Sequence, residues 1–137
     1  MRWDPIFNLR KGDMKKFSKS HEWYEPINDH GIRIGITHHA AVELSDVVFV
    51  EFPDIGKKLS DRQSVCVLES VKAVADVYSL AGEVIAINEK LKTEPQLVNQ
   101  DPQGSGWLVE VRLNDMNSLN NYMTEEDYLE FVNSSST

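Results

Sequence analysis

The clearest pattern in the chain is an alternation of apolar and polar residues that begins at Trp107 and ends at Leu113. Every second residue of this run is apolar, while Glu110 and Arg112 occupy positions between them. Successive side chains of a β-strand point to opposite faces, so the run predicts a strand with one buried face. This strand is expected to cover a hydrophobic core with its apolar side.

Other β-rich stretches are separated by short turns, as in an antiparallel sandwich. A turn at residues 28–31 predicts a hairpin, because Gly31 suits a positive φ. Its strands are expected near residues 17–24 and 32–36. Residues 47–52 are apolar on both faces and predict a buried strand. Further strands are predicted at residues 64–69, 76–80 and 83–88.

Short helices are predicted around these strands. Thr37 suits the cap of a helix over residues 38–44, and Pro95 suits the start of a helical turn over residues 94–98. Two more helices are predicted at residues 115–121 and 125–132. The second is expected to begin at a Thr124 cap and to pack through Tyr128, Leu129 and Val132. The fold class is therefore mainly β, with peripheral helices and a C-terminal helix.

The length of 137 residues suits one domain and leaves little room for an enclosed catalytic cleft. Residues 1–13 contain no serine and carry Asp4 and Asp13, unlike a mitochondrial presequence. We expect residues 1–13 to be an extension, either a remnant of recombinant expression or a native arm. Residues 14–137 are then the domain.

The formal net charge of −8 disfavours nucleic acid and anionic membranes as partners. Proteins with basic docking surfaces suit this charge better. Cys66 is the single cysteine, which excludes an internal disulfide, and no apolar run is long enough to span a bilayer. The expected compartment is therefore a reducing one.

The candidate chemistry lies in residues 68–73, where Lys72 stands between Val71 and Ala73 and between two β-rich runs. Residues 70–75 contain no Gly, Pro or Asn, so their pattern fits a helix as well as a turn. Physical chemistry alone favours an ordinary solvated lysine, because most lysines keep their charge in water.

A series of landmarks around this lysine is more specific. In chain order they are Ser20-His21-Glu22-Trp23, Gly35-Ile36-Thr37 with Ala40, Asp46-Val47-Val48-Phe49-Val50 with Pro53, Glu69-Ser70-Val71-Lys72-Ala73, Gly82-Glu83-Val84, Pro95 with Leu97-Val98-Asn99, and Gly106-Trp107. Together they resemble the glycine cleavage system H protein family from about Phe17 to Val132. Two departures lie in turns: Ser45 stands where the family usually has glycine, and Leu80-Ala81 replaces a proline-containing approach to Gly82.

This resemblance implies a flattened half-barrel of the lipoyl/biotinyl type, with lipoic acid bound covalently to Lys72 at a hairpin tip. Glu69, Ser70 and Ala73 would form the context that the attaching enzyme recognises. That enzyme would be a lipoate ligase or an octanoyltransferase. The protein would be a swinging-arm carrier rather than an enzyme.

The implied cargo is the aminomethyl group of glycine, which enters one-carbon metabolism. The implied partners are a pyridoxal-phosphate-dependent glycine decarboxylase (P protein), a tetrahydrofolate-dependent aminomethyltransferase (T protein) and dihydrolipoamide dehydrogenase (L protein). A long arm on a rigid hairpin would make delivery to each docked enzyme effectively intramolecular. A monomer is expected, in the cytoplasm or in the mitochondrial matrix of a eukaryote.

The resemblance also places Ser20, Glu22 and Asp76 along a shallow cleft that receives the arm. The loaded arm carries a positive amine, whereas the oxidised dithiolane is neutral. We therefore expect the two carboxylates to hold the loaded arm more firmly than the oxidised arm.

Several other functions compete with this one. A lipoate donor in lipoyl relay would use the same arm, and the sequence does not separate it from glycine cleavage. A biotinyl carrier is disfavoured because its lysine usually lies between methionines, and a lipoyl domain of a 2-oxoacid dehydrogenase typically has Asp before its lysine. An enzyme using Cys66 with a histidine is disfavoured because a cysteine in an apolar strand normally acts as a small hydrophobe. The adjacent His38 and His39 match no zinc-site spacing.

Overall fold

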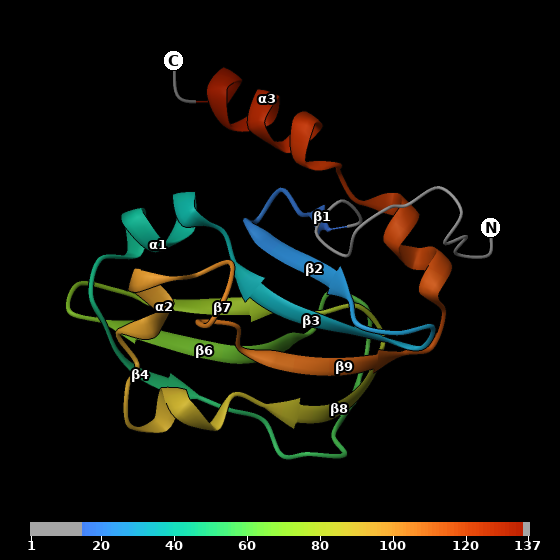
Figure 1. Ribbon diagram of the computed structural model, residues 1–137, viewed down its shortest axis with the longest axis horizontal. Helices are drawn as coiled ribbons and strands as arrows, with labels where there is room; N and C mark the ends of the chain where they lie inside the picture. Colours follow the sequence, from blue (N-terminus) through green and yellow to red (C-terminus); the bar gives the residue numbers. More distant parts are fainter. Residues whose placement is uncertain (1–14, 136–137) are drawn as a thin grey trace.

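The computed structural model, which describes residues 15–135, is built around two antiparallel β-sheets (Figure 1). Within these residues the larger sheet has six strands, in the spatial order β1 (Lys16–Phe17), β2 (Glu22–Pro26), β3 (Gly31–Ile36), β9 (Val109–Leu113), β8 (Gly82–Ile87) and β5 (Lys58–Leu59). The smaller sheet has three, in the order β4 (Val47–Glu51), β6 (Ser64–Ser70) and β7 (Val74–Tyr78). The helical segments are α1 (His38–Leu44), η3 (Glu89–Lys92), α2 (Leu97–Gln100), η4 (Met116–Asn121) and α3 (Glu125–Ser135).

The predicted fold class is confirmed: the sheets are antiparallel and open, the helices are short, and a helix closes the described chain. The short connection after β7 carries the chain from the smaller sheet to β8 in the larger one. The predicted extension, residues 1–13, lies outside the described residues, as does the predicted domain start at residue 14.

The main core draws on both sheets and follows the alternation of the strands. Val109 and Val111 on β9 are fully buried, while Arg112 between the apolar positions is exposed, as predicted. Leu68 and Val77 contribute from the smaller sheet to the same buried cluster. Each fully buried side chain of this kind contributes about 1.5 to 3 kcal/mol of transfer free energy.

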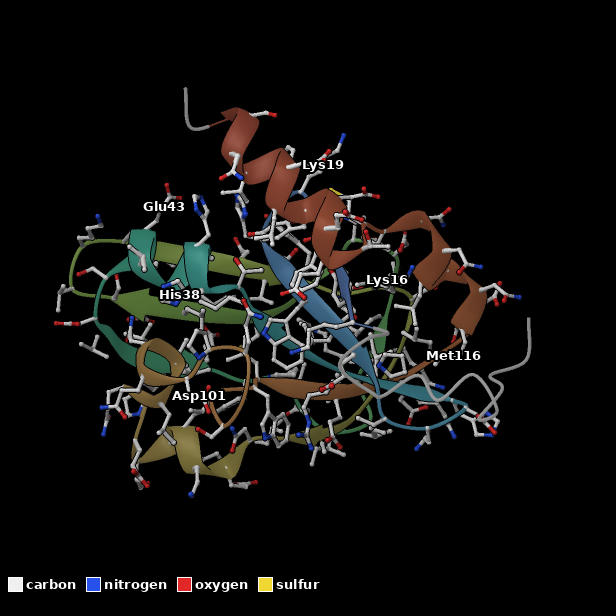
Figure 2. All side chains as sticks on the ribbon, turned by 45° about the horizontal axis from the view of Figure 1, so that its top comes forward. Lys16, Lys19, His38, Glu43, Asp101 and Met116 are labelled. Atoms are coloured by element: carbon white, nitrogen blue, oxygen red, sulfur yellow. The ribbon has the colours of Figure 1, made fainter. Side chains whose placement is uncertain are left out.

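A second, smaller apolar cluster lies under α3, which covers β1 and β2 (Figure 2). Phe17, Trp23 and Tyr128 are its buried members, and Phe131 and Val132 pack against them. The aromatic rings of Phe17 and Tyr128 stack with centroids 5.0 Å apart. The C-terminal helix is therefore fastened to the edge of the larger sheet by aromatic packing.

The start of α3 agrees with its prediction, and its apolar stripe differs by one residue. Thr124 Oγ1 accepts a hydrogen bond from the Asp127 N–H at 3.2 Å, which caps the helix. Leu129, predicted to pack, is 52% exposed. Because helix neighbours on one face are three or four residues apart, Phe131 rather than Leu129 lies beside Tyr128 on the buried side.

The prediction of a buried strand at residues 47–52 is wrong for half of its side chains. Val47 and Val50 are buried, whereas Val48 and Phe49 are each 54% exposed. A bulge between Val47 and Phe49 shifts the pairing of β4 with β6, and β4 is the edge of the smaller sheet. One face of β4 is solvated. Because the sequence places apolar residues on both faces of this strand, some of them remain exposed to solvent.

The predicted hairpin between β2 and β3 is confirmed, but its turn closes without a positive φ at Gly31. Asn28 Oδ1 accepts hydrogen bonds from the N–H groups of His30 and Gly31 at 2.8 and 2.9 Å. A Cβ at Gly31 would lie 3.3 Å from the Val111 carbonyl oxygen. The asparagine side chain thus makes the turn, and the close approach of β9 favours glycine.

The predicted helices are present with shifted boundaries. Thr37 Oγ1 accepts a hydrogen bond from the Ala40 N–H at 3.2 Å and caps α1 as predicted. α2 begins at Leu97 rather than at Pro95, because Pro95 lies in a preceding turn closed by the Leu97 N–H and the Glu94 carbonyl. The helical turn η3 has no counterpart among the predicted elements.

Ser45 ends α1 with φ 69° and ψ −163°. Only glycine adopts this backbone region without strain, and other residues pay about 1 to 3 kcal/mol there. The Ser45 carbonyl accepts a hydrogen bond from Asn99 Nδ2 at 2.7 Å, which helps to hold the chain in this conformation.

Ser45→Gly is therefore expected to raise the free energy of unfolding by about 1 kcal/mol, after the entropic penalty of glycine is subtracted. Urea unfolding curves of the two proteins measure this difference. Ser45→Ala serves as the control and should not stabilise, because it keeps the Cβ. A loss of stability in the glycine variant would contradict the expectation.

Candidate functional site

Lys72 lies in the tight turn between β6 and β7. Ser70 shapes this turn, because its Oγ accepts hydrogen bonds from the N–H groups of Lys72 and Ala73 at 3.2 and 3.0 Å. The Ser70 N–H donates to the Ala73 carbonyl at 2.8 Å. Residues 70–75 thus form a turn and the start of a strand rather than a helix. Within residues 15–135, the exposed Lys72 amine has no hydrogen-bond or ion-pair partner.

Exposed apolar side chains surround the lysine. Val71 in the turn is 66% exposed and Val74 at the start of β7 is 71% exposed. Phe49 on β4 and Val74 on β7 flank Glu69 on β6 along one line of the strand register. Apolar surface grouped in this way, beside a carboxylate, suits contact with another protein.

Glu22 is buried on β2, with 1% of its side chain exposed. Its Oε1 accepts hydrogen bonds from the hydroxyls of Ser18 and Ser20, the second at 2.6 Å. Its Oε2 accepts a hydrogen bond from the Tyr78 N–H on β7 at 3.0 Å. This carboxylate therefore joins the larger sheet to the end of β7. Burial, and then the nearby Glu22 charge, raises the pKa of the Tyr24 hydroxyl above its ordinary value.

One face of β7 leads from the hairpin tip toward Glu22. Val74, Asp76 and Tyr78 share this face, because side chains alternate along a strand. Asp76 is exposed, and its Oδ1 accepts a hydrogen bond from Ser64 Oγ at 2.8 Å. From residue 74 to residue 78 the strand spans roughly 13 Å. The predicted Ser20 and Glu22 thus lie together at the far end of this face, and Asp76 lies between them and the tip.

Arg62, in the turn before β6, completes this group and was missed in the sequence. Its Nη2 donates a hydrogen bond to Ser20 Oγ at 2.9 Å, and its Nη1 lies 3.9 Å from Glu22 Oε1. Its guanidinium carbon lies 5.1 Å from the centre of the Tyr78 ring. Ser20 is 42 residues away along the chain. No local pattern marks such a contact, since the surrounding residues indicate only a polar turn.

Cys66 is 2% exposed on β6, and burial raises the pKa of its thiol to about 12. At neutral pH the native protein then holds about 1,000-fold less thiolate than an unfolded chain with a thiol pKa of 9.0. Since the thiolate is the nucleophile, iodoacetamide should label the native protein at least this much more slowly than the urea-unfolded protein. Equal labelling rates in the native and the unfolded protein would contradict this expectation and would support a reactive role for Cys66.

Three of the four histidines lie around α1 and α3. His38 is exposed on α1 (Figure 2), and His39 lies 3.6 Å from the Glu43 carboxylate one turn later. His21 Nδ1 is 2.7 Å from the Tyr128 hydroxyl on α3. Burial, followed by the nearby His39, lowers the pKa of His21. In residues 15–135 no group of three or more His, Cys, Asp or Glu side chains is arranged to hold a metal ion.

The family model of the glycine cleavage H-protein matches residues 15–135. The chain belongs to the glycine cleavage H-protein family. It is 45% identical over 119 residues to the glycine cleavage system H protein of Thermotoga maritima, covering 86% of this chain and 95% of that protein. It is 42% identical over 118 residues to the H protein of Coprothermobacter proteolyticus, covering 85% and 93%. The crystal structure of an H protein from Mycobacterium marinum superposes with a TM-score of 0.80 at 29% identity, covering 89% of this chain and 98% of that one.

Membership of the H-protein family confirms the resemblance found in the sequence. It makes the protein a carrier rather than an enzyme, as predicted. No helix within residues 15–135 has the length and apolar character needed to cross a membrane.

Proposed function

We propose that this H-protein family member carries lipoic acid on Lys72 and delivers the aminomethyl group of glycine between glycine decarboxylase, aminomethyltransferase and dihydrolipoamide dehydrogenase. The observation that supports it most is the exposed amine of Lys72, which has no partner within residues 15–135 and is presented on a turn that Ser70 fixes. An exposed amine on a rigid tip is accessible to an acylating enzyme. The role of Glu69, Ser70 and Ala73 is then to define that tip for a lipoate ligase or an octanoyltransferase.

The residues near Lys72 fit a lipoyl group. Attached lipoate supplies thiol–disulfide exchange, a chemistry for which the buried Cys66 is unsuited. The β7 face between the tip and Tyr78 has about the length of an extended lipoyl-lysine side chain. Asp76 and Ser20 would line the path of the arm, and Glu22 would hold Ser20 and the end of β7 in place.

The apolar residues at the tip give the partner enzymes a surface to bind. Phe49, Val71 and Val74 expose apolar area beside Glu69. The net charge of −8 adds long-range attraction to a basic partner surface and would raise the association rate at low salt. Docking at the tip brings the arm within reach of a partner's active site, so delivery becomes intramolecular.

The test is to incubate the protein with lipoate ligase, ATP and lipoate, and then with glycine and glycine decarboxylase. Intact-mass measurement should show one lipoyl group, peptide mapping should place it on Lys72, and loading should add one aminomethyl group. Attachment at Lys90 or Lys92 instead would contradict the assignment. A lipoylated protein that cannot be loaded, yet donates lipoate to another lipoyl domain, would show that lipoyl relay is the function.

A further inference from the structure

The side chain of Asn99, on the short helix α2, joins the end of α1 to the start of β4. α2 lies beside α1 (Figure 1). Asn99 Oδ1 accepts a hydrogen bond from the Val47 N–H at 2.8 Å, and Nδ2 donates to the Ser45 carbonyl at 2.7 Å. Nδ2 also donates to the Ala41 carbonyl at 3.4 Å. One amide side chain therefore binds the backbone on both sides of Asp46.

The backbone that Asn99 binds is strained. Ser45 has φ 69° and ψ −163°, a region that residues other than glycine rarely adopt. An amide offers an acceptor and a donor together, so it satisfies the Val47 N–H and the Ser45 carbonyl at once and opposes relaxation of Ser45. Asp46 follows directly, and relaxation of Ser45 would turn the Asp46 carbonyl away from its present direction.

The Asp46 carbonyl anchors the turn that presents Lys72. It accepts a hydrogen bond from the Val71 N–H at 3.0 Å. Ser70 supplies the bonds inside the turn, because its Oγ accepts from the N–H groups of Lys72 and Ala73. Ser70 thus sets the shape of the turn, whereas the bond from Val71 to Asp46 ties the turn to the segment between α1 and β4.

We propose that Asn99 is a positioning residue for the turn that carries Lys72. By holding residues 45–47, it keeps the Asp46 carbonyl in place to anchor the Val71 N–H. The consequence for attachment rests on the proposed lipoyl-carrier function. A turn that is already held in place costs the attaching enzyme little ordering entropy when it binds. Loosening the turn weakens recognition by lipoate ligase and leaves transfer to the bound amine at its ordinary rate.

The experiment compares the wild-type protein with Asn99→Ala and Asn99→Asp. Alanine removes both contacts of the amide. Aspartate keeps the size of the side chain and the acceptor for the Val47 N–H, but it loses the donor to the Ser45 carbonyl. It is the smaller change and carries the test should the alanine variant fail to fold.

Asn88→Ala is the matched control. Asn88 Nδ2 donates to the carbonyls of Ser105 and Trp107 at 2.9 and 2.8 Å, so the same kind of bond between an amide and the backbone is lost. In the described part of the chain, Asn88 has no hydrogen bond to residues 45–47 or 70–73. Thermal melts of all four proteins define a temperature at which each is folded, and the comparison is made there.

Two measurements are made on each protein before any lipoyl group is attached. The first is exchange of backbone amide hydrogens, followed residue by residue by NMR, which reports how firmly the turn is anchored. The second is steady-state lipoylation by lipoate ligase, which joins the lipoate carboxyl to the Lys72 amine as ATP becomes AMP and pyrophosphate. KM for the carrier protein and kcat are determined separately, because a loosened turn changes binding rather than the transfer step.

In Asn99→Ala, amide exchange at Val71 should be about tenfold faster, the effect of one lost hydrogen bond, and exchange at Lys72 and Ala73 should be unchanged. KM should rise about fivefold, with kcat within about twofold of wild type. Asn99→Asp should shift Val71 exchange and KM in the same direction, and Asn88→Ala should shift neither.

Unchanged Val71 exchange or unchanged KM in the folded Asn99 variants would overturn the proposal, as would an equal rise of KM in Asn88→Ala. Failure of the wild-type protein to take up a lipoyl group on Lys72 would instead refute the proposed function. The two failures are distinguishable, because amide exchange tests the anchoring of the turn without any attached group.

Discussion

Lys72→Arg is expected to accept no lipoyl group and to lose all transfer of the aminomethyl group, while the protein stays folded. Arginine keeps the positive charge, but its guanidinium is not an acylable amine. The Lys72 side chain is exposed at the turn, and the hydrogen bonds that shape the turn come from its backbone N–H and from Ser70. The free energy of unfolding should therefore change by less than about 0.5 kcal/mol.

Intact mass after treatment with ligase, ATP and lipoate measures the first part, and release of labelled carbon dioxide from glycine by the decarboxylase measures the second. Lys90→Arg and Lys92→Arg, both on η3, are the matched controls and should be lipoylated as wild type. Glycine decarboxylation supported by the Lys72→Arg protein would refute the carrier role of this residue.

The sequence predicted best where one physical requirement governs a whole element. The alternation in β9 was readable because one face must meet the core and the other must meet water. The caps of α1 and α3 were readable because Thr37 and Thr124 each satisfy an N–H at the start of a helix. Such requirements act over a few neighbouring residues, so a local pattern records them.

The predictions failed where distant parts of the fold decide the outcome. Val48 and Phe49 are exposed because a bulge shifts the pairing of β4 with β6 and because one face of β4 is solvated, which depends on how the whole sheet is arranged. Gly31 suits its site through the approach of Val111, some 80 residues later in the chain. Neither cause produces a pattern in the neighbouring residues from which it could be predicted.

In the candidate site, too, some features could be predicted from the sequence and others depend on distant contacts. The family resemblance pointed to Lys72, and the structure adds the reason that its turn is rigid, which is the Ser70 side chain. The resemblance also pointed to Ser20 and Glu22, which the structure brings together with Arg62. Arg62 was not foreseen, because its left-handed backbone and its reach across the two sheets have no signature in hydrophobic periodicity.

Gly82→Ala is expected to be the most destabilising of the substitutions considered. Gly82 begins β8, between Leu59 on β5 and Leu113 on β9. A Cβ at this position would overlap the Arg112 carbonyl oxygen and would lie 2.9 Å from Val111 Cγ1. The oxygen belongs to the backbone of the paired strand, so no side-chain rotation relieves the overlap and β8 must move away from β9.

Such overpacking costs about 3 kcal/mol, and for a domain of this size it lowers the melting temperature by about 10 °C. Gly56→Ala is the control, because it tests backbone strain without steric overlap. Gly56 has φ 95° and open space around it, so alanine there should cost about 1 to 2 kcal/mol of strain. Urea unfolding and thermal melts of both variants measure the difference. Equal losses of stability in the two variants would mean that β8 moves away from β9 at little cost. The close backbone approach would then not be the reason for glycine at position 82.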